Sequence, residues 1–333
     1  MSEPAKELDF GLDFKSAPER LVGERDERLA MSKRMLHYEV SFLDDILVGI
    51  MPHDLILLGA YTGAGKTALA SHIAKKNAGR GRRVAYFALE GEPKEIERRI
   101  KYSFVIWQAR SDGLGNHLRG ISYRRWYACL YDDVVGYLDE WAQRQVEEFL
   151  GSMSTYYRGS DFTSDDLERL FFAIQDQTDL IILDHLHYID TDDSNENRAY
   201  KRIIKAIRNA SLSIGVPVLC LAHLRKQDRK NQQAVPGLDE FHGSSDIVKI
   251  ATQVITLARA EDRESSRPYI SNTYMHVAKD RMDGATRFAA EIGFDVVSKF
   301  YADKYRLGRL APGNASWEPV DRDTHPAWAK NAI

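Results

Sequence analysis

The sequence has little cysteine and no long hydrophobic run, and these two absences exclude several classes of protein. Only two of the 333 residues are cysteine, so the chain can form neither a disulfide framework nor a cysteine-based metal site. Its longest apolar stretches, such as residues 55–61 and 216–222, are far shorter than the roughly 20 residues that a membrane-spanning helix needs. The N-terminus lacks the basic start and apolar core of a signal peptide. We therefore expect a soluble, cytoplasmic protein without a membrane partner.

Net charge is also low, but the charged residues are unevenly distributed. The formal net charge is −3, from 46 Lys and Arg against 49 Asp and Glu. Residues 160–197 contain eleven acidic residues and one basic residue, whereas residues 198–230 contain nine Lys or Arg and one Asp. The second segment is therefore a local cationic region that can bind a polyanion, although the whole chain is slightly acidic.

Short apolar runs alternate with segments of helical periodicity through most of the chain. This alternation predicts an α/β fold with a mainly parallel, doubly wound sheet. Strands of such a sheet are covered on both faces, which agrees with continuous hydrophobic runs such as LILLG and LIIL. The runs that we interpret as strands are residues 55–59, 83–89, 180–183, 216–221, 253–257 and 274–278.

Composition and periodicity divide the chain into three parts. Residues 1–35 are charged and weakly periodic, which predicts an arm or linker helix. Residues 36–310 carry the sheet, and residues 311–333 contain three prolines and predict a tail that runs over the surface. From about residue 102 to 150, aromatic residues recur at helical spacing among Leu, Ile and Val. This pattern favours a helical insert packed on the sheet over an aromatic surface that stacks nucleic-acid bases.

A glycine-rich turn between a predicted strand and a predicted helix is the strongest functional signal. In LILLGAYTGAGKTALA, Gly63 and Gly65 allow backbone N–H groups to face phosphate oxygens, while Lys66 reaches the terminal phosphates. The hydroxyl of Thr67 is expected to bind Mg²⁺. Ala60 occupies the first glycine position of the usual GxxxxGKS/T pattern. We predict a nucleotide site formed by Ala60, Thr62, Gly63, Ala64, Gly65, Lys66 and Thr67.

Polar residues end three of the other predicted strands. Asp184 follows LIIL and is expected to hold Mg²⁺ from the second side, because doubly wound folds bind ligands at the carboxyl edge of the sheet. Glu90 is a candidate base for the water that attacks the γ-phosphate, with Glu92 as the competing carboxylate. A surface ion pair with the nearby Lys and Arg residues is the alternative for either glutamate. His223 is placed to sense the γ-phosphate.

Histidine spacing gives no indication of a structural metal. His185 and His187 are two residues apart, and neither a cysteine nor a third histidine accompanies them at the spacing of a zinc site.

Cationic residues follow in a helix and in the loop after the next strand. Arg198 and Lys201 lie on one stripe of an amphipathic segment, which taken alone indicates a solvated charged face. The following loop, which runs to Gly243, gathers further cations that can follow a phosphodiester backbone. The candidate nucleic-acid ligands are Arg198, Lys201, Arg225, Lys226, Arg229, Lys230, Gly243 and Ser244.

A second cationic pair, Lys279 and Arg281, lies far along the chain from Lys66. The two residues are two apart at a strand end, so their side chains project the same way. Because Lys66 already serves the phosphates, this pair indicates an arginine finger supplied to a neighbouring copy. An exposed pair near Asp280 and Asp283 is an equally good interpretation of the local sequence.

In this order and spacing, the segments resemble the motor domain of the DnaB-type, superfamily 4 replicative helicases, including Twinkle-type members, over about residues 38–303. AYTGAGKT matches the family's Walker A motif, FALEGE the strand that ends in the catalytic glutamate, LIILDHLHYI the Walker B motif, and KDRMDG the motif of the trans-acting pair. LCLAHLRK resembles the motif whose polar tip couples the γ-phosphate to the DNA loops, and FHGSSDIVKIATQVITL the segment after the second DNA loop. The resemblance implies a RecA-like domain, a hexameric ring with single-stranded DNA in its channel, and a nucleotide between subunits.

The leading interpretation is thus an ATP- and Mg²⁺-dependent hexameric helicase that translocates on single-stranded DNA and unwinds duplexes. A loader, primase or replication initiator is the candidate protein partner. One alternative is a RecA- or RadA-like recombinase or regulatory ATPase. Another is a DNA-binding scaffold or loader whose DNA binding is controlled by ATP and which does not unwind DNA.

Overall fold

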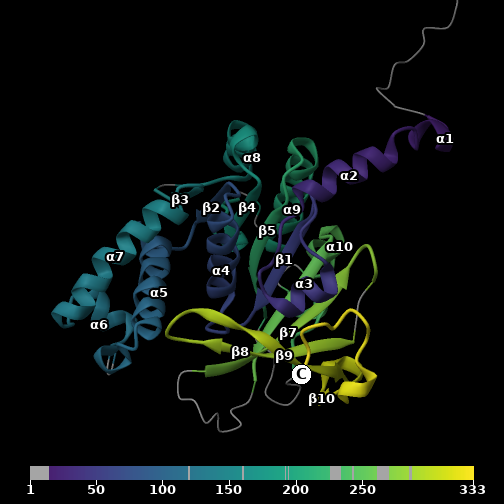
Figure 1. Cartoon of the computed structure of the whole chain (residues 1–333). Helices are drawn as coiled ribbons and strands as arrows, with labels where there is room; N and C mark the ends of the chain where they lie inside the picture. The colour runs from purple at the N-terminus through teal and green to yellow at the C-terminus, as the bar shows by residue number, and fades with distance from the viewer. Residues whose placement is uncertain are drawn as a thin grey trace, which may run out of the picture.

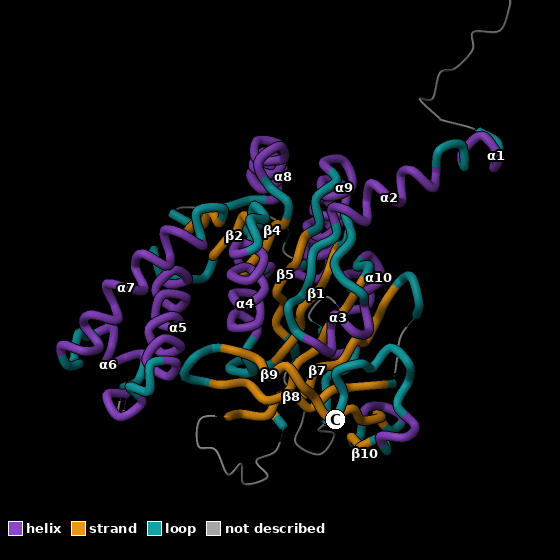
Figure 2. The backbone as a smooth tube through the Cα atoms, viewed as in Figure 1, coloured by secondary structure: helices purple, strands orange, loops and turns teal. Residues whose placement is uncertain are grey.

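A single sheet organises the chain (Figures 1 and 2). The computed structural model describes residues 15–118, 121–159, 161–191, 193, 195–225, 234–241, 244–260, 270–284 and 287–333. Within them the strand order is β10-β9-β8-β7-β6-β1-β5-β4-β2-β3. Parallel pairing joins β1 (Leu55–Ala60), β2 (Val84–Ala88), β3 (Met153–Tyr157), β4 (Leu180–Asp184), β5 (Val218–His223) and β6 (Gln253–Arg259). The prediction of an α/β fold with a mainly parallel sheet is confirmed.

Helices cover both faces of the parallel strands. Alternate residues of β1 enter different cores: Ile56 and Leu58 pack in one with helix α4, whereas Leu55 and Leu57 pack in the other with helix α9. This alternation explains why the strand is hydrophobic without interruption. The helices are α1 (Ala17–Arg20), α2 (Glu24–Arg34), α3 (Ser41–Leu47), α4 (Lys66–Gly79), α5 (Glu95–Ser111), α6 (Tyr123–Tyr127), α7 (Asp133–Phe149), α8 (Ser164–Ile174), α9 (Glu196–Ile214) and α10 (Ser244–Ile250).

Four antiparallel strands extend the sheet beyond β6. They are β7 (Ile270–Asp280), β8 (Phe288–Asp295), β9 (Phe300–Leu310) and β10 (Trp317–Pro319). Residues 274–278, predicted as one of the strands that alternate with helices, lie in β7, which pairs antiparallel with β6. Only residues 260–269 separate β6 from β7, and a parallel crossover needs about a dozen residues or more.

The insert and the two ends of the chain differ in how they pack. Helices α5, α6 and α7 share a core that contains Tyr102, Trp126, Ile106 and Leu138, so aromatic residues pack among aliphatic ones. Helices α1 and α2 bury none of their residues and project from the body (Figure 1). Residues 311–333, expected to run over the surface, are exposed or half-buried except for Ala329, and they add the short strand β10 to the sheet. None of the described helices combines the length and hydropathy required to cross a membrane.

Gly59 of β1 lies directly against the ring of Phe241. A Cβ atom added at Gly59 would lie 2.3 Å from Cζ of Phe241, a distance that real Cβ atoms do not adopt. The glycine before the phosphate loop is therefore required by packing against the segment that follows β5.

We expect Gly59→Ala to lower the free energy of unfolding by about 1–3 kcal/mol, because the added methyl group overpacks the contact with Phe241. Chemical denaturation measures the change. Gly79→Ala is the matched control: an added Cβ there meets nothing within 4 Å, so stability should stay the same or rise slightly. Equal stability of both variants would contradict the close contact.

Lys75 of α4 is buried and forms no ion pair with an acidic side chain of the described residues. Its Nζ donates to Ser103 Oγ at 3.0 Å and lies 3.9 Å from the ring centroid of Phe300. Burial, with a smaller contribution from Lys76, lowers the pKa of Lys75 from 10.5 to about 7. The folded protein therefore releases this proton at a pH where the unfolded chain still binds it.

We expect the stability of the protein to rise, through Lys75, as pH increases from about 7 toward 10.5, with a slope of up to about 1.4 kcal/mol per pH unit. Lys75→Met should remove this contribution and stabilise the protein most at pH 7 and below. The measurement is the difference in unfolding free energy between the two proteins at several pH values. A difference independent of pH would contradict the depressed pKa.

Candidate nucleotide site and cationic surfaces

The glycine-rich loop forms one wall of a cavity at the carboxyl edge of the parallel strands. Gly63 and Gly65 have φ angles of 80° and 102°, which favour glycine, and Lys66 begins α4 directly after them. Residues 62–68 line a cavity of about 460 Å³ together with Glu90, His185 and other residues. This volume lies within the roughly 300–1,000 Å³ typical of small-molecule sites.

Lys66 is held at the base of this cavity. It is only 7% exposed, and its Nζ donates to the carbonyl oxygen of Ala60 at 2.7 Å and lies 3.4 Å from His223 Nδ1. Burial lowers the pKa of Lys66, while the charges of Asp184 and Glu90 oppose that shift. The ammonium group is thus positioned beside the backbone N–H groups of the loop, where an anionic phosphate would meet both.

Thr67 and Asp184 form a pair of oxygen donors that fits Mg²⁺. Thr67 Oγ1 lies 3.4 Å from Asp184 Oδ1, and adjacent ligands of an octahedral Mg²⁺ lie about 2.9 Å apart. Tyr86 donates to Asp184 Oδ2 at 2.7 Å and orients the carboxylate. Burial raises the pKa of Asp184 to about 6, because the charged carboxylate is poorly solvated there. A cation bound beside it would stabilise the charged form.

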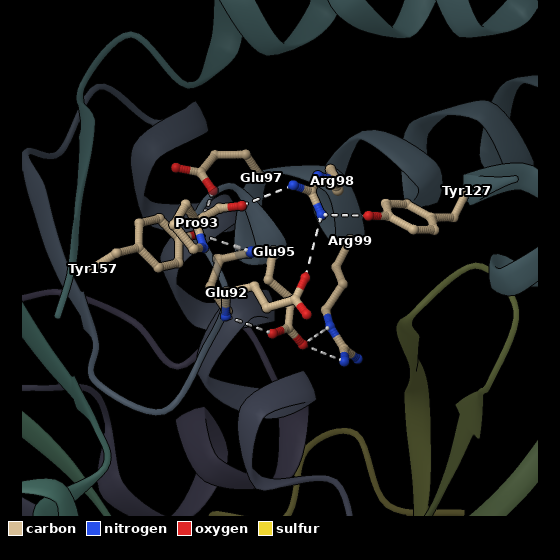
Figure 3. A network of polar contacts seen from close by, with 9 residues as sticks. Glu92, Pro93, Glu95, Glu97, Arg98, Arg99, Tyr127 and Tyr157 are labelled. Atoms are coloured by element: carbon tan, nitrogen blue, oxygen red, sulfur yellow. Dashed lines mark hydrogen bonds and ion pairs between the residues drawn. The ribbon is translucent and has the colours of Figure 1, made fainter. Parts of the chain in front are cut away.

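The structure distinguishes Glu90 from Glu92. Glu90 lines the cavity, and its Oε2 lies 2.7 Å from His185 Nε2. Glu92 points away into the network at the start of α5, where its carboxylate lies 4.0 Å from Arg98 and its N–H donates to Glu95 (Figure 3). Of the two alternatives weighed from sequence, the surface ion pair applies to Glu92.

Histidines gather beside Glu90 at the ends of β4 and β5. The ring centroids of His185 and His223 lie 4.1 Å apart, and those of His187 and His223 lie 5.5 Å apart. The Asp184–His185 peptide bond is cis. Burial, reinforced by nearby positive groups, lowers the pKa of His185 to about 3, so its imidazole is neutral at physiological pH. The sequence spacing did not reveal that Glu90, His185 and His223 come together.

Other residues of the cavity were not identified from the sequence. Arg99 comes from α5, where it pairs with Glu95, and Phe294 and Lys299 come from the β8–β9 hairpin. Arg259 at the end of β6 also contributes. No local motif surrounds these residues, because only the antiparallel extension of the sheet brings the hairpin over the phosphate loop.

The predicted nucleic-acid ligands are only partly described. Arg198 is exposed near the start of α9, whereas Lys201 pairs with Asp246 of α10 at 2.8 Å. The backbone N–H of Arg225 donates to the carbonyl oxygen of Glu240 at 2.7 Å. Lys226, Arg229, Lys230 and Gly243 lie outside the described residues, as does the side chain of Ser244.

Lys279 and Arg281 lie at the amino-terminal ends of the parallel strands, whereas the phosphate loop lies at their carboxyl ends. Asp280, between them, pairs with Gln253 at the start of β6, whereas the loop follows the end of β1. The six residues of β1 separate the two edges by about 20 Å. Neither side chain can therefore reach the cavity of its own chain.

Both side chains contact the C-terminal end of α10. Lys279 Nζ donates to three carbonyl oxygens, those of Val248, Lys249 and Ala251, at 2.7, 2.9 and 2.8 Å. Arg281 Nη2 lies 3.3 Å from the carbonyl oxygen of Ile250 and is exposed. Lys279 thus caps a helix within its own chain, a contact that its local sequence does not indicate.

Comparison with protein families identifies the domain. The model of the AAA domain matches residues 30–229, more than half of the chain. The chain belongs to this family. The model of the DnaB-like helicase C terminal domain matches residues 163–300. The predicted resemblance is confirmed: this is a DnaB-type, RecA-like ATPase domain.

Solved structures with the same fold agree with this assignment. One solved ATPase domain superposes with a TM-score of 0.70 at 17% identity, over 87% of this chain and 99% of that one. A DnaB-like replicative helicase, described with its interactions with primase, gives 0.70 at 16% identity, over 87% and 67%. A KaiC-like protein from Pyrococcus horikoshii gives 0.53 at 15% identity, over 80% and 97%. No curated protein sequence matches the chain.

For this DnaB-type ATPase domain, we expect Glu90→Gln to lower ATP hydrolysis about 10²-fold or more while nucleotide binding is retained. Glu92→Gln is the matched control and should change hydrolysis by less than about twofold, because Glu92 points away from the cavity. Steady-state ATPase assays and fluorescent nucleotide titration measure the two effects. Lys66→Ala should lose binding as well. The assignment is wrong if Glu92→Gln is the variant that loses hydrolysis.

Proposed function

We propose that the protein is a Mg²⁺-dependent, ATP-driven motor that translocates on single-stranded DNA and unwinds duplexes as a hexameric ring. The observation that carries this proposal is the separation of Lys279 and Arg281 from the nucleotide cavity of their own chain. A cationic finger at the far edge of the sheet is useful to hydrolysis only when a second copy presents its cavity to that edge.

Within the cavity, the residues have complementary roles. The phosphate loop and Lys66 bind the phosphates, and Glu90 orients and deprotonates the attacking water. Thr67 and Asp184 would hold Mg²⁺, which when bound neutralises charge on the phosphate oxygens. His223, adjacent to Lys66, lies where it can respond to the γ-phosphate. Arg281 of a neighbouring copy completes the site, with Lys279 as the residue that positions it through α10.

The N-terminal helices support assembly into an oligomer. Leu21, Val22 and Leu29 are 64%, 77% and 51% exposed, although all three are large apolar residues. The described part of the chain buries no residue of helices α1 and α2, so a second copy is a natural source of further contacts. The DnaB-like relative solved with its primase interactions makes a primase or a loader a candidate further partner.

The cationic loop after β5 is connected to the phosphate loop. Leu224 and Phe241 pair across the two ends of this segment, and Phe241 packs on Gly59. The hydroxyl of Tyr61, within the phosphate loop, hydrogen-bonds to the buried carboxylate of Glu240. A change in the phosphate loop on ATP binding is thereby transmitted to the segment expected to hold DNA.

The decisive experiment measures ATP hydrolysis with and without single-stranded DNA over a range of protein concentrations, together with particle imaging. A ring-forming motor should show DNA-stimulated activity per chain that rises with concentration, and strand displacement from a forked duplex. Activity that is independent of dilution and of DNA would contradict the proposal. Filaments would favour a RecA- or RadA-like recombinase, and DNA binding without displacement would favour a scaffold or loader.

The KaiC-like structural likeness favours one second candidate, a regulatory ATPase without a DNA substrate. That candidate also fits the phosphate loop and Glu90. It does not explain the cationic segment from Arg198 onward. Absence of DNA binding, with ring assembly and hydrolysis retained, would favour it.

We expect Arg281→Ala to bind nucleotide normally but to lose about 10³-fold in DNA-stimulated hydrolysis, the lower end of the range for arginine fingers. Mixing Arg281→Ala with Glu90→Gln should restore partial activity, because a mixed ring contains interfaces in which both residues are intact. Lys279→Met should show a smaller loss, since Lys279 acts through α10. Failure of mixing to restore any activity would contradict action in trans.

Tyr61→Phe is expected to lower the ratio of DNA-stimulated to basal hydrolysis several-fold, because it removes the hydrogen bond to Glu240. Basal hydrolysis and nucleotide affinity measure whether the phosphate loop itself is intact. Glu240→Gln, which retains a hydrogen-bond acceptor, should keep more of the stimulation. Tyr137→Phe, at a residue 64% exposed on α7, is the matched control. An unchanged ratio for Tyr61→Phe would contradict the coupling.

A further inference from the structure

Three potential metal ligands from three separate segments meet beside the phosphate loop. Glu90 follows β2, His185 follows β4 and His223 ends β5. One ligand atom from each, a carboxylate oxygen and two ring nitrogens, lies within 4.8 Å of the others. They form a donor set distinct from Thr67 and Asp184, which offer only oxygen.

Imidazole nitrogens favour a divalent ion of intermediate softness, such as Zn²⁺, over Mg²⁺, which prefers oxygen ligands. Two imidazoles and one carboxylate are the three protein ligands of one class of zinc site, in which a water or substrate takes the fourth position. His185 is 1% exposed, and neither of its ring nitrogens has a hydrogen-bond partner of acceptable geometry among the described residues.

The three donor atoms need only small shifts to reach the spacing of zinc ligands: His185 Nε2 and Glu90 Oε2 must move slightly apart, and any pair near 4.8 Å must approach. Ligand atoms of a tetrahedral Zn²⁺ lie about 3.4 Å apart. His185 Nε2 and Glu90 Oε2 are 2.7 Å apart, and the Glu90 side chain is half-exposed, so its carboxylate can rotate to make room for an ion. The cavity leaves a side open for a fourth ligand. The positive charge of Lys66, whose Nζ lies 3.4 Å from His223 Nδ1, weakens the binding of a cation at this site.

We propose that Glu90, His185 and His223 bind Zn²⁺, and that the bound ion inhibits ATP hydrolysis by occupying the carboxylate of Glu90. The inhibitory effect rests on the proposed function, in which Glu90 is the base. Binding of the ion does not, and it can be measured without any hydrolysis assay.

The first test is competition for Zn²⁺ between the full chain and a chromophoric chelator, without nucleotide. The chain should bind one equivalent, and His185→Asn should weaken binding at least about tenfold. His187→Asn, in the same histidine cluster but outside the donor set, should bind as the unaltered chain does. Glu90→Gln, at a half-exposed residue, gives a second variant that should also weaken binding if His185→Asn does not fold.

The second test adds Zn²⁺ to an ATPase assay in excess Mg²⁺. Hydrolysis should fall as the site fills and recover when the chelator removes the ion. Failure of the chain to bind Zn²⁺, or equal binding by His185→Asn, overturns the site. Loss of Zn²⁺ binding in Asp184→Asn but not in His185→Asn would place the ion with the Mg²⁺ ligands and overturns it too. If the chain binds one equivalent of Zn²⁺ and still hydrolyses ATP at the same rate, Glu90 is not a ligand of the ion, and the proposed site is wrong. A chain that binds Zn²⁺ but hydrolyses no ATP would contradict the proposed function and leave the site standing.

Discussion

Parallel pairing of β1 with β5 and β6 fixes where the reactive groups of this protein lie. Ala60 pairs with His223 on one side and Leu257 on the other, so three strand ends meet at one edge. Each strand delivers its polar residue there because parallel strands share a direction. Because β7 runs antiparallel to β6, its last residues lie beside the start of β6, at the opposite end of the parallel strands. The nucleotide cavity and the Lys279–Arg281 pair are therefore separated by the length of one strand, and this separation makes a second copy necessary for the proposed chemistry.

The residues that the sequence could predict are those whose role depends on local structure. The phosphate loop needs only a strand, a glycine turn and a helix in succession, and all three are contiguous. Asp184 and Glu90 were identifiable because each ends an apolar run. The choice between Glu90 and Glu92 was not, because it depends on whether a side chain faces His185 or Arg98, and both partners are distant in sequence.

The parts that the sequence could not predict depend on contacts between distant segments. The antiparallel extension follows from a connection too short for a crossover, and its β8–β9 hairpin brings Phe294 and Lys299 to the nucleotide cavity. The short strand β3 has alternating rather than continuous burial, because it lies at the edge of the sheet, and so it lacked the apolar run that marks its neighbours. The cluster of Glu90, His185 and His223 likewise exists only once three strands are paired.

The cap on α10 has an evolutionary consequence. Lys279 binds main-chain oxygens, and every amino acid supplies one. Replacement of side chains along the last turn of that helix leaves all three acceptors in place, provided the turn stays helical. Sequence drift in α10 is thus tolerated at this junction, whereas the lysine itself has no substitute of equal reach and charge other than arginine, whose planar head cannot converge on three carbonyls in the same way.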